Sequence, residues 1–201
     1  MKYVFLVGGF ADSPLLQERI KDHFGHSYRI MVPQNASLAV VQGAVMFGQK
    51  PDVFESRVMT ASYGIRVHKL FLDGLHPDSK KVMINGIARC KDVFFKFVQV
   101  NEIVKVGEIR RFPGFAPLTG AQKQVKIDFY QSELADVEYV TDSGVEKAPG
   151  RGLVLETPDA WKTRDIEINL HFGGTEIKVT VVNPTSNTQA TAYLDFLATN
   201  Q

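Results

Sequence analysis

The run IEINLHFGGTEIKVTVVN over residues 166–183 decides the fold of most of the chain. Apolar side chains occupy every second position from Ile166 to Phe172 and again from Ile177 to Val181. A period of two is the pattern of a strand with one buried face. Gly173-Gly174 separates the two runs, and turn residues between alternating runs indicate a hairpin. We therefore predict two antiparallel strands here.

The same period extends upstream, over residues 65–68 and 125–130. The run from Phe95 to Val100 alternates in two short pieces with a slip between them. Such a slip marks either a bulge or a strand buried on both faces. Several strands with turn signals and no long helix favour an antiparallel β-sandwich over residues 62–201.

The first fifty residues have a different pattern, in which strand and helix signals alternate. An apolar run at 4–7 and a short one at 28–32 predict strands. Ser13-Pro14 suits a helix start, and a second, almost wholly apolar helix is expected over 37–47. We predict an α/β piece over 1–50 whose sheet partners are missing, because two strands are too few for a stable sheet. Residues 51–61 are expected to form a linker.

Composition excludes several classes of function. The chain has 201 residues, 44% hydrophobic residues and a formal net charge of +1, so no field of one sign favours nucleic acid or an anionic membrane. No apolar run reaches membrane-spanning length. The single cysteine, Cys90, cannot form an internal disulfide and favours a cytoplasmic location, either as a weakly reactive surface thiol or as a buried one.

Two local features are candidate sites. Gly8-Gly9, between a strand and a helix, is either a plain turn or a place where a ligand approaches the backbone. The segment from Phe112 to Leu118, read as a loop between strands, either enters the core or forms an apolar binding rim. Neither standard phosphate-loop motif is present, and no cluster of metal ligands accompanies the histidines.

The motifs resemble those of the 70-kDa heat-shock protein family. Residues 4–9, VFLVGG, followed by Pro14, resemble the adenosine motif of actin-like ATPases. Residues 39–45, AVVQGAV, resemble the helix that follows it in this family. Residues 62–65, SYGI, resemble the opening of the family's substrate-binding β-domain, and CKDVF at 90–94 points to the divergent branch designated 12A and 12B. The resemblance implies the C-terminal part of an actin-like ATPase domain followed by that β-domain, without its helical lid.

The resemblance also implies roles for particular residues. Asp12 stands where the ordinary family has an arginine against the adenine, which removes a cation–π contact. The implied adenosine-side positions are Gly8, Gly9, Phe10, Ala11 and Asp12. The implied peptide-cleft positions are Ile65 and Val67 on one side, and Phe115, Leu118, Val125 and Ile127 on the other.

The expected function is that of a chaperone-like binding module for unfolded or extended peptide segments, with co-chaperones as further partners. The family's phosphate loops and catalytic lysine lie upstream of Met1, so this chain is not expected to hydrolyse ATP or to bind ATP or ADP tightly by itself. The alternatives are an ATP-hydrolysing chaperone in full-length form, and a structural interaction protein with degenerate nucleotide and peptide sites.

Overall fold

The computed structural model describes residues 2–50, 53–150, 152–163, 165–173 and 176–195. The chain divides into two compact units, Met1–Phe54 and Glu55–Gln201, and each is described by itself. Parts of two predictions lie outside the described residues: positions 51 and 52 of the linker, and Gly174 of the hairpin turn.

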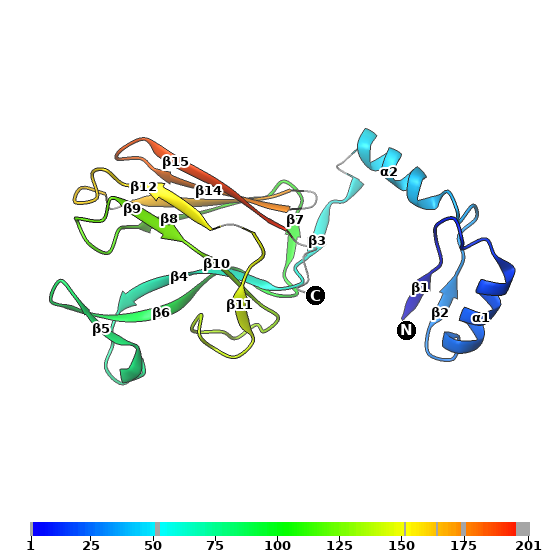
Figure 1. Cartoon of the computed structure of the whole chain (residues 1–201), viewed down its shortest axis with the longest axis horizontal. Helices are drawn as coiled ribbons and strands as arrows, with labels where there is room; N and C mark the ends of the chain where they lie inside the picture. Colours follow the sequence, from blue (N-terminus) through cyan, green and yellow to red (C-terminus); the bar gives the residue numbers. More distant parts are fainter. Residues whose placement is uncertain (1, 51–52, 151, 164, 174–175, 196–201) are drawn as a thin grey trace. The chain divides into compact units, whose positions relative to one another are not determined.

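The first unit has the predicted strand–helix–strand–helix order (Figure 1). Its strands β1 (Tyr3–Phe5) and β2 (Arg29–Met31) pair in parallel, with Tyr3 opposite Arg29. The helices are α1 (Pro14–Phe24) and α2 (Ala39–Gln49). Pro14 opens α1, as expected for a residue whose missing N–H has no helical partner at that position.

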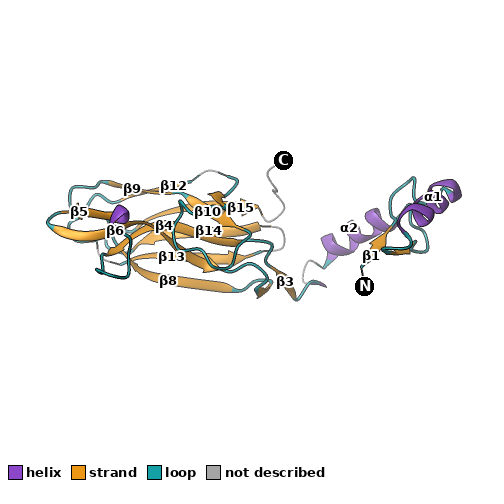
Figure 2. Ribbon diagram, turned by 90° about the horizontal axis from the view of Figure 1, so that it is seen from below, coloured by secondary structure: helices purple, strands orange, loops and turns teal. Residues whose placement is uncertain are grey.

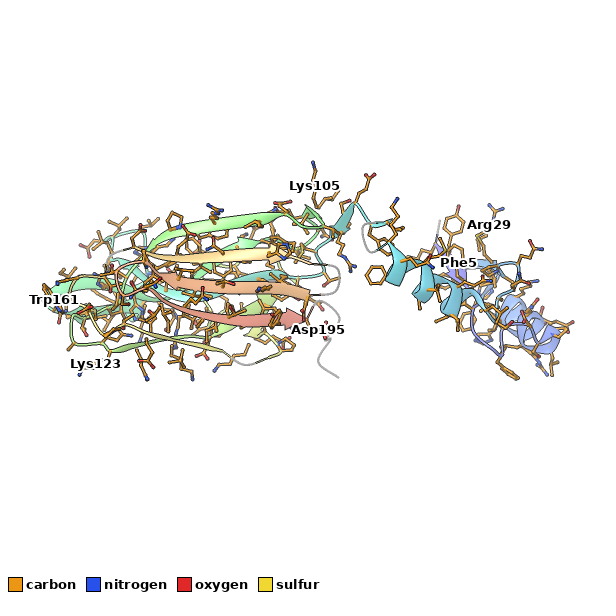
Figure 3. The ribbon with its side chains drawn as sticks, turned by 90° about the horizontal axis from the view of Figure 1, so that it is seen from above. Phe5, Arg29, Lys105, Lys123, Trp161 and Asp195 are labelled. Carbon is orange, nitrogen blue, oxygen red and sulfur yellow. The ribbon has the colours of Figure 1, made fainter. Side chains whose placement is uncertain are left out.

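Little of this first unit is buried. Neither helix contains a buried residue, and within the described part of the unit burial is confined to Ala11 and Ala36. Apolar side chains of α2 stay open, with Val41 62% and Val45 55% exposed. Phe5 on β1 is 60% exposed as well (Figure 3). The apolar faces predicted from the sequence are therefore present but are not covered within the unit.

The second unit is built almost entirely of strands (Figure 2). One sheet has the order β11-β10-β4-β6-β5 and the other β15-β14-β13-β8, and every pairing is antiparallel. The strands of the first sheet are β4 (Ser62–Leu70), β5 (Lys81–Ile84), β6 (Ile87–Val98), β10 (Phe129–Ser132) and β11 (Val145–Lys147). Those of the second are β8 (Ile109–Phe115), β13 (Ile166–Phe172), β14 (Glu176–Asn183) and β15 (Thr188–Asp195). Two further pairs join β9 (Gln124–Ile127) to β12 (Leu153–Glu156) and β3 (Ser56–Val58) to β7 (Ile103–Lys105).

The core of this unit lies between the two sheets, which Figure 1 shows as separate layers. Alternate residues of β13 and β14 supply much of it, including the fully buried Leu170 and Val179. Tyr63 and Phe97 contribute from the other sheet. The predicted antiparallel β-sandwich and its hairpin are thus confirmed, with Phe172 paired to Ile177 across the turn.

Three details differ from the sequence prediction or decide between its alternatives. The predicted linker over 51–61 contains β3, and Met59 after it is only 1% exposed, because this short strand pairs with β7. The slip after Phe95 is a bulge, since Tyr63 and Gly64 pair with Val98 and Lys96 and leave Phe97 unpaired.

The segment from Phe112 was predicted to be a loop, and this was wrong as far as Phe115. Strand β8 continues through Pro113 to Phe115. A proline is tolerated there because β8 is the edge strand of its sheet. Gly114 takes the left-handed φ of 88° where the β8–β13 register shifts, so the chain bends without leaving the sheet.

Candidate functional site

One cavity of about 480 Å³ opens on the second unit, between strand β4 and the β8–β9 segment. Residues 114–118 and 124–127 form one part of its lining, and β4 forms another. All six residues predicted for a peptide cleft line it: Ile65, Val67, Phe115, Leu118, Val125 and Ile127. The structure therefore gathers into one cavity residues that are up to 62 positions apart in the sequence (127 − 65).

Strand β4 contributes a buried side chain to the cavity, and part of one of its edges has no strand partner among the described residues. Ile65 is 3% exposed and belongs to the core, whereas Val67 is partly buried against it. Strand β4 pairs with β10 only as far as Ile65, but its pairing with β6 continues to Leu70. Beyond Ile65, one edge of β4 therefore has no strand partner among the described residues.

The Phe115 side chain belongs both to the core and to the cavity. Its ring lies 5.1 Å from the ring of Phe95 at an interplanar angle of 81°, which is a favourable edge-on contact. Phe112 packs on the same ring and on Phe97, with centroids 5.8 and 4.9 Å away. The two alternatives raised for this segment therefore divide between its residues: Phe112 belongs with the core, and Phe115 also faces the cavity.

The connection that carries Leu118 is held by hydrogen bonds. The Leu118 N–H donates to Oε1 of Gln122 at 3.1 Å. Thr157, which is fully buried, donates its hydroxyl to the Gln122 carbonyl and its N–H to the Lys123 carbonyl, both at 2.7 Å. Trp161 packs so closely on Gly120 that an added Cβ would lie 3.2 Å from the Trp161 Cβ. Figure 3 shows Lys123 and Trp161 at the same end of the second unit.

The rim of the cavity is basic. Its lining includes Arg66 and His68 of β4, Arg89 of β6 and Lys126 of β9, and none of the described residues that line it is Asp or Glu. Burial lowers the pKa of His68 below its usual 6.5, Asp92 opposes this shift, and the positive charges of Arg66 and Arg89 add to it. The side chain is therefore mostly neutral near pH 7, and the fixed charges of the rim come from the other three residues.

The five adenosine-side positions lie together on the turn from β1 to α1. Gly8 has a φ of 95°, and its N–H donates to the Ala36 carbonyl at 2.8 Å. Ala11 is 3% exposed and closes the turn by donating to the Gly8 carbonyl at 2.9 Å. A Cβ on Gly8 or Gly9 would meet no atom within 4 Å, so this backbone is open to a ligand. Phe10 is 72% exposed and Asp12 is exposed.

Other kinds of site find no support in the described residues. No three His, Cys, Asp or Glu side chains gather there at metal-binding distance. The Cys90 thiol is fully buried in a small cluster with Phe71 and Tyr139, which decides between the two environments considered for it. No helix in the described part of the chain is long and apolar enough to cross a membrane.

No protein-family model matches the chain, but curated relatives do. It is 36% identical over 200 residues to heat shock 70 kDa protein 12A of Mus musculus, a match that covers 98% of this chain. Heat shock 70 kDa protein 12B of Homo sapiens is 36% identical over 208 residues, again with 98% of the chain covered. The chain is a homologue of the heat shock 70 kDa proteins 12A and 12B. This confirms the family resemblance, and the chain spans about 30% of the length of these relatives.

The relationship of this 12A/12B homologue extends across both units, because the match covers nearly the whole chain. Sequence reasoning found the apolar residues of its cavity but missed the basic rim. The signal was available in part: Arg66 and His68 alternate with Ile65 and Val67, but alternation alone does not indicate that the charged residues border a cavity. The sequence around Arg89 gives no comparable indication. Arg89 lies on β6, and the segment 71–86, which includes β5, separates β6 from β4 along the chain.

Proposed function

We propose that the second unit binds extended peptide segments in the cavity between β4 and the β8–β9 segment, as a chaperone-family binding module. The observation that carries the proposal is the gathering of six apolar residues, named beforehand from the family resemblance, around one cavity. A cavity of about 480 Å³ lies within the range of ligand-binding clefts, which is about 300–1,000 Å³.

The open strand edges near the cavity support this proposal. Among the described residues, β4 has no strand partner on one edge beyond Ile65, and β8 is the edge strand of its sheet. An extended peptide gains affinity by hydrogen bonding its backbone to such an edge and gains specificity by placing alternate side chains in pockets. Val67 and Leu118 are placed to contact an apolar side chain held in this way.

For the first unit, we propose the role of the C-terminal piece of an actin-like ATPase domain, forming part of the adenosine side of an ATP site in a longer protein. The open backbone at Gly8 and Gly9 supports this role. Phosphoryl transfer requires a metal ion, a phosphate cradle and a positioned nucleophile together. One adenosine-side turn supplies none of these, so we propose that this chain alone neither hydrolyses ATP nor binds it tightly. We place the longer protein in the cytoplasm, where a free thiol such as Cys90 stays reduced.

Peptide binding is tested with labelled peptides of varied apolar content, followed by fluorescence anisotropy. We expect peptides rich in Leu, Ile and Val to bind and purely polar peptides not to bind. Leu118→Ala should weaken binding about ten-fold, because it removes one apolar contact. Val154→Ala is the matched control: Val154 is 48% exposed on β12 and does not line the cavity. Equal affinity for polar and apolar peptides, or equal effects of the two variants, would contradict the proposal.

The nucleotide proposal is tested by titrating the chain with labelled ATP and assaying phosphate release. We expect no release above buffer and no saturable binding at micromolar ATP. Measurable turnover by the purified chain would overturn this part of the proposal, and it would favour the alternative that ATPase activity resides in these residues.

A further inference from the structure

The charge around the cavity differs from the charge of the whole chain. The chain carries 23 Lys and Arg against 22 Asp and Glu, so it is nearly balanced. Among the described residues, the cavity lining contains Arg66, Arg89 and Lys126 but no Asp or Glu. The positive charge is therefore a local property of this site and has no counterpart in the overall composition.

Two of these cations have no counter-charge of their own within the described residues. Neither Arg66 nor Arg89 forms an ion pair there, and the buried Nε of Arg89 has no hydrogen-bond acceptor. Lys126 lies 3.6 Å from Asp128, but its side chain is 68% exposed, so this pair is weak.

The cations come from different parts of the lining. Arg66 and Arg89 belong to β4 and β6 of one sheet, whereas Lys126 belongs to β9, which pairs with β12. On β4 and β9 these charged residues stand between apolar residues of the cavity. Arg66 lies between Ile65 and Val67, and Lys126 lies between Val125 and Ile127. Because successive residues of a strand point to opposite faces, the charged residues border the apolar wall, and the residues that flank a bound apolar side chain would meet them.

Resting on the proposed peptide-binding function, we infer that this cavity selects extended segments in which apolar residues are flanked by Asp or Glu. Guanidinium groups bind carboxylates through charge-assisted and often paired hydrogen bonds, and neither Arg66 nor Arg89 is engaged in an ion pair among the described residues. Basic flanks would meet like charge, which disfavours them. The charge of the flanking residues is thus a second determinant of which peptides bind, besides their apolar content.

The test uses the whole chain and three labelled peptides that share one apolar core and one label. Their flanking residues are Glu, Gln or Lys. We expect the Glu-flanked peptide to bind about ten-fold more tightly than the Gln-flanked one and the Lys-flanked peptide to bind most weakly, because two or three partly exposed ion pairs contribute. Raising sodium chloride from about 50 to about 500 mM should reduce these differences, since salt screens exposed charges.

The matched variants are Arg66→Gln and Arg111→Gln. Arg66 is exposed on the rim, so its replacement leaves the core intact, and Arg111 is an exposed arginine on β8 that does not line the cavity. Arg66→Gln should reduce the Glu-over-Gln preference about three-fold, and Arg111→Gln should leave it unchanged.

The outcomes separate the two proposals. Equal affinities for the three peptides, a preference for Lys flanks, or equal effects of the two variants would overturn the charge selection while peptide binding still stands. Failure of all three peptides to bind would overturn the proposed function itself.

Discussion

The two units of this chain carry equally clear apolar patterns and bury very different amounts of them. In Met1–Phe54, helix α2 is mostly apolar but Val41 remains 62% exposed. In Glu55–Gln201, Leu170 and Val179 on neighbouring strands are completely buried. Sequence periodicity thus specifies an element and its apolar face, whereas burial of that face requires a second surface to pack against it. The sandwich supplies that surface with its own two sheets, and the first unit does not.

Hydrogen exchange should show the largest difference between the units. Amides of α1 and α2 are expected to exchange roughly 100-fold faster or more than those of β13 and β14, because local opening is easiest where few apolar contacts must break. The measurement is native-state amide exchange followed by mass spectrometry of peptic fragments. Equal protection of α2 and β13 would contradict this expectation and would show that the first unit is stabilised in a way that burial does not reveal.

Glycine-to-alanine substitutions should have opposite effects on stability in the two units. A Cβ on Gly64 would collide with the Phe95 carbonyl and lie 2.7 Å from the Phe94 ring, so Gly64→Ala should cost about 1–3 kcal/mol. Gly43, inside α2, has no atom within 4 Å of an added Cβ. Gly43→Ala should therefore favour the helix by roughly 0.5–1 kcal/mol.

Urea unfolding measures the effect at Gly64, and exchange rates of the α2 amides measure the effect at Gly43. A harmless Gly64→Ala would mean that β4 and β6 can separate at the bulge without loss. A destabilising Gly43→Ala would instead indicate that α2 packs closely against another surface at this residue.

The smallest expected effect is the pH dependence that His68 gives the second unit. Burial lowers the pKa of its imidazole, with Asp92 opposing and Arg66 and Arg89 adding to the shift. Below the usual pKa of 6.5, the unfolded chain therefore binds more protons at this position, and the free energy of unfolding falls as the pH decreases.

The contribution of His68 is measured by comparing the chain with His68→Gln in urea at about pH 7.5 and about pH 5.5. Lowering the pH should reduce the free energy of unfolding of the original chain more than that of the variant His68→Gln. A difference that is independent of pH would mean that His68 is as accessible to protons in the folded protein as in the unfolded chain.

The fold class was predictable because several of the strands show their period directly. The hairpin of β13 and β14 follows from strict alternation on either side of turn residues. Strand β3 was missed because three residues are too few to establish a period, and its pairing with β7 is a long-range contact. The end of β8 was misjudged because Pro113 and Gly114 are turn residues by composition, and only the position of β8 at the sheet edge makes them acceptable in a strand.

The cavity was predictable only through the family resemblance. Nothing in the local sequence places Ile65 and Leu118 in the same cavity, because contacts between distant segments leave no periodic signal. The basic rim was less predictable still, since a cation on an exposed strand position ordinarily faces solvent. Whether a carboxylate lies near Arg66 depends on segments that come together only in the folded protein, so no single segment of the sequence shows it.

The packing of Trp161 on Gly120 gives the protein a built-in optical probe. Trp161 is the only tryptophan in the chain and is 60% exposed, so its emission is sensitive to changes in the surrounding solvent. Its Cβ and backbone lie against Gly120, which belongs to the same connection that carries Leu118 into the cavity. A shift in its emission spectrum on mixing with an unlabelled peptide would therefore report movement of that connection in real time, without any modification of the chain.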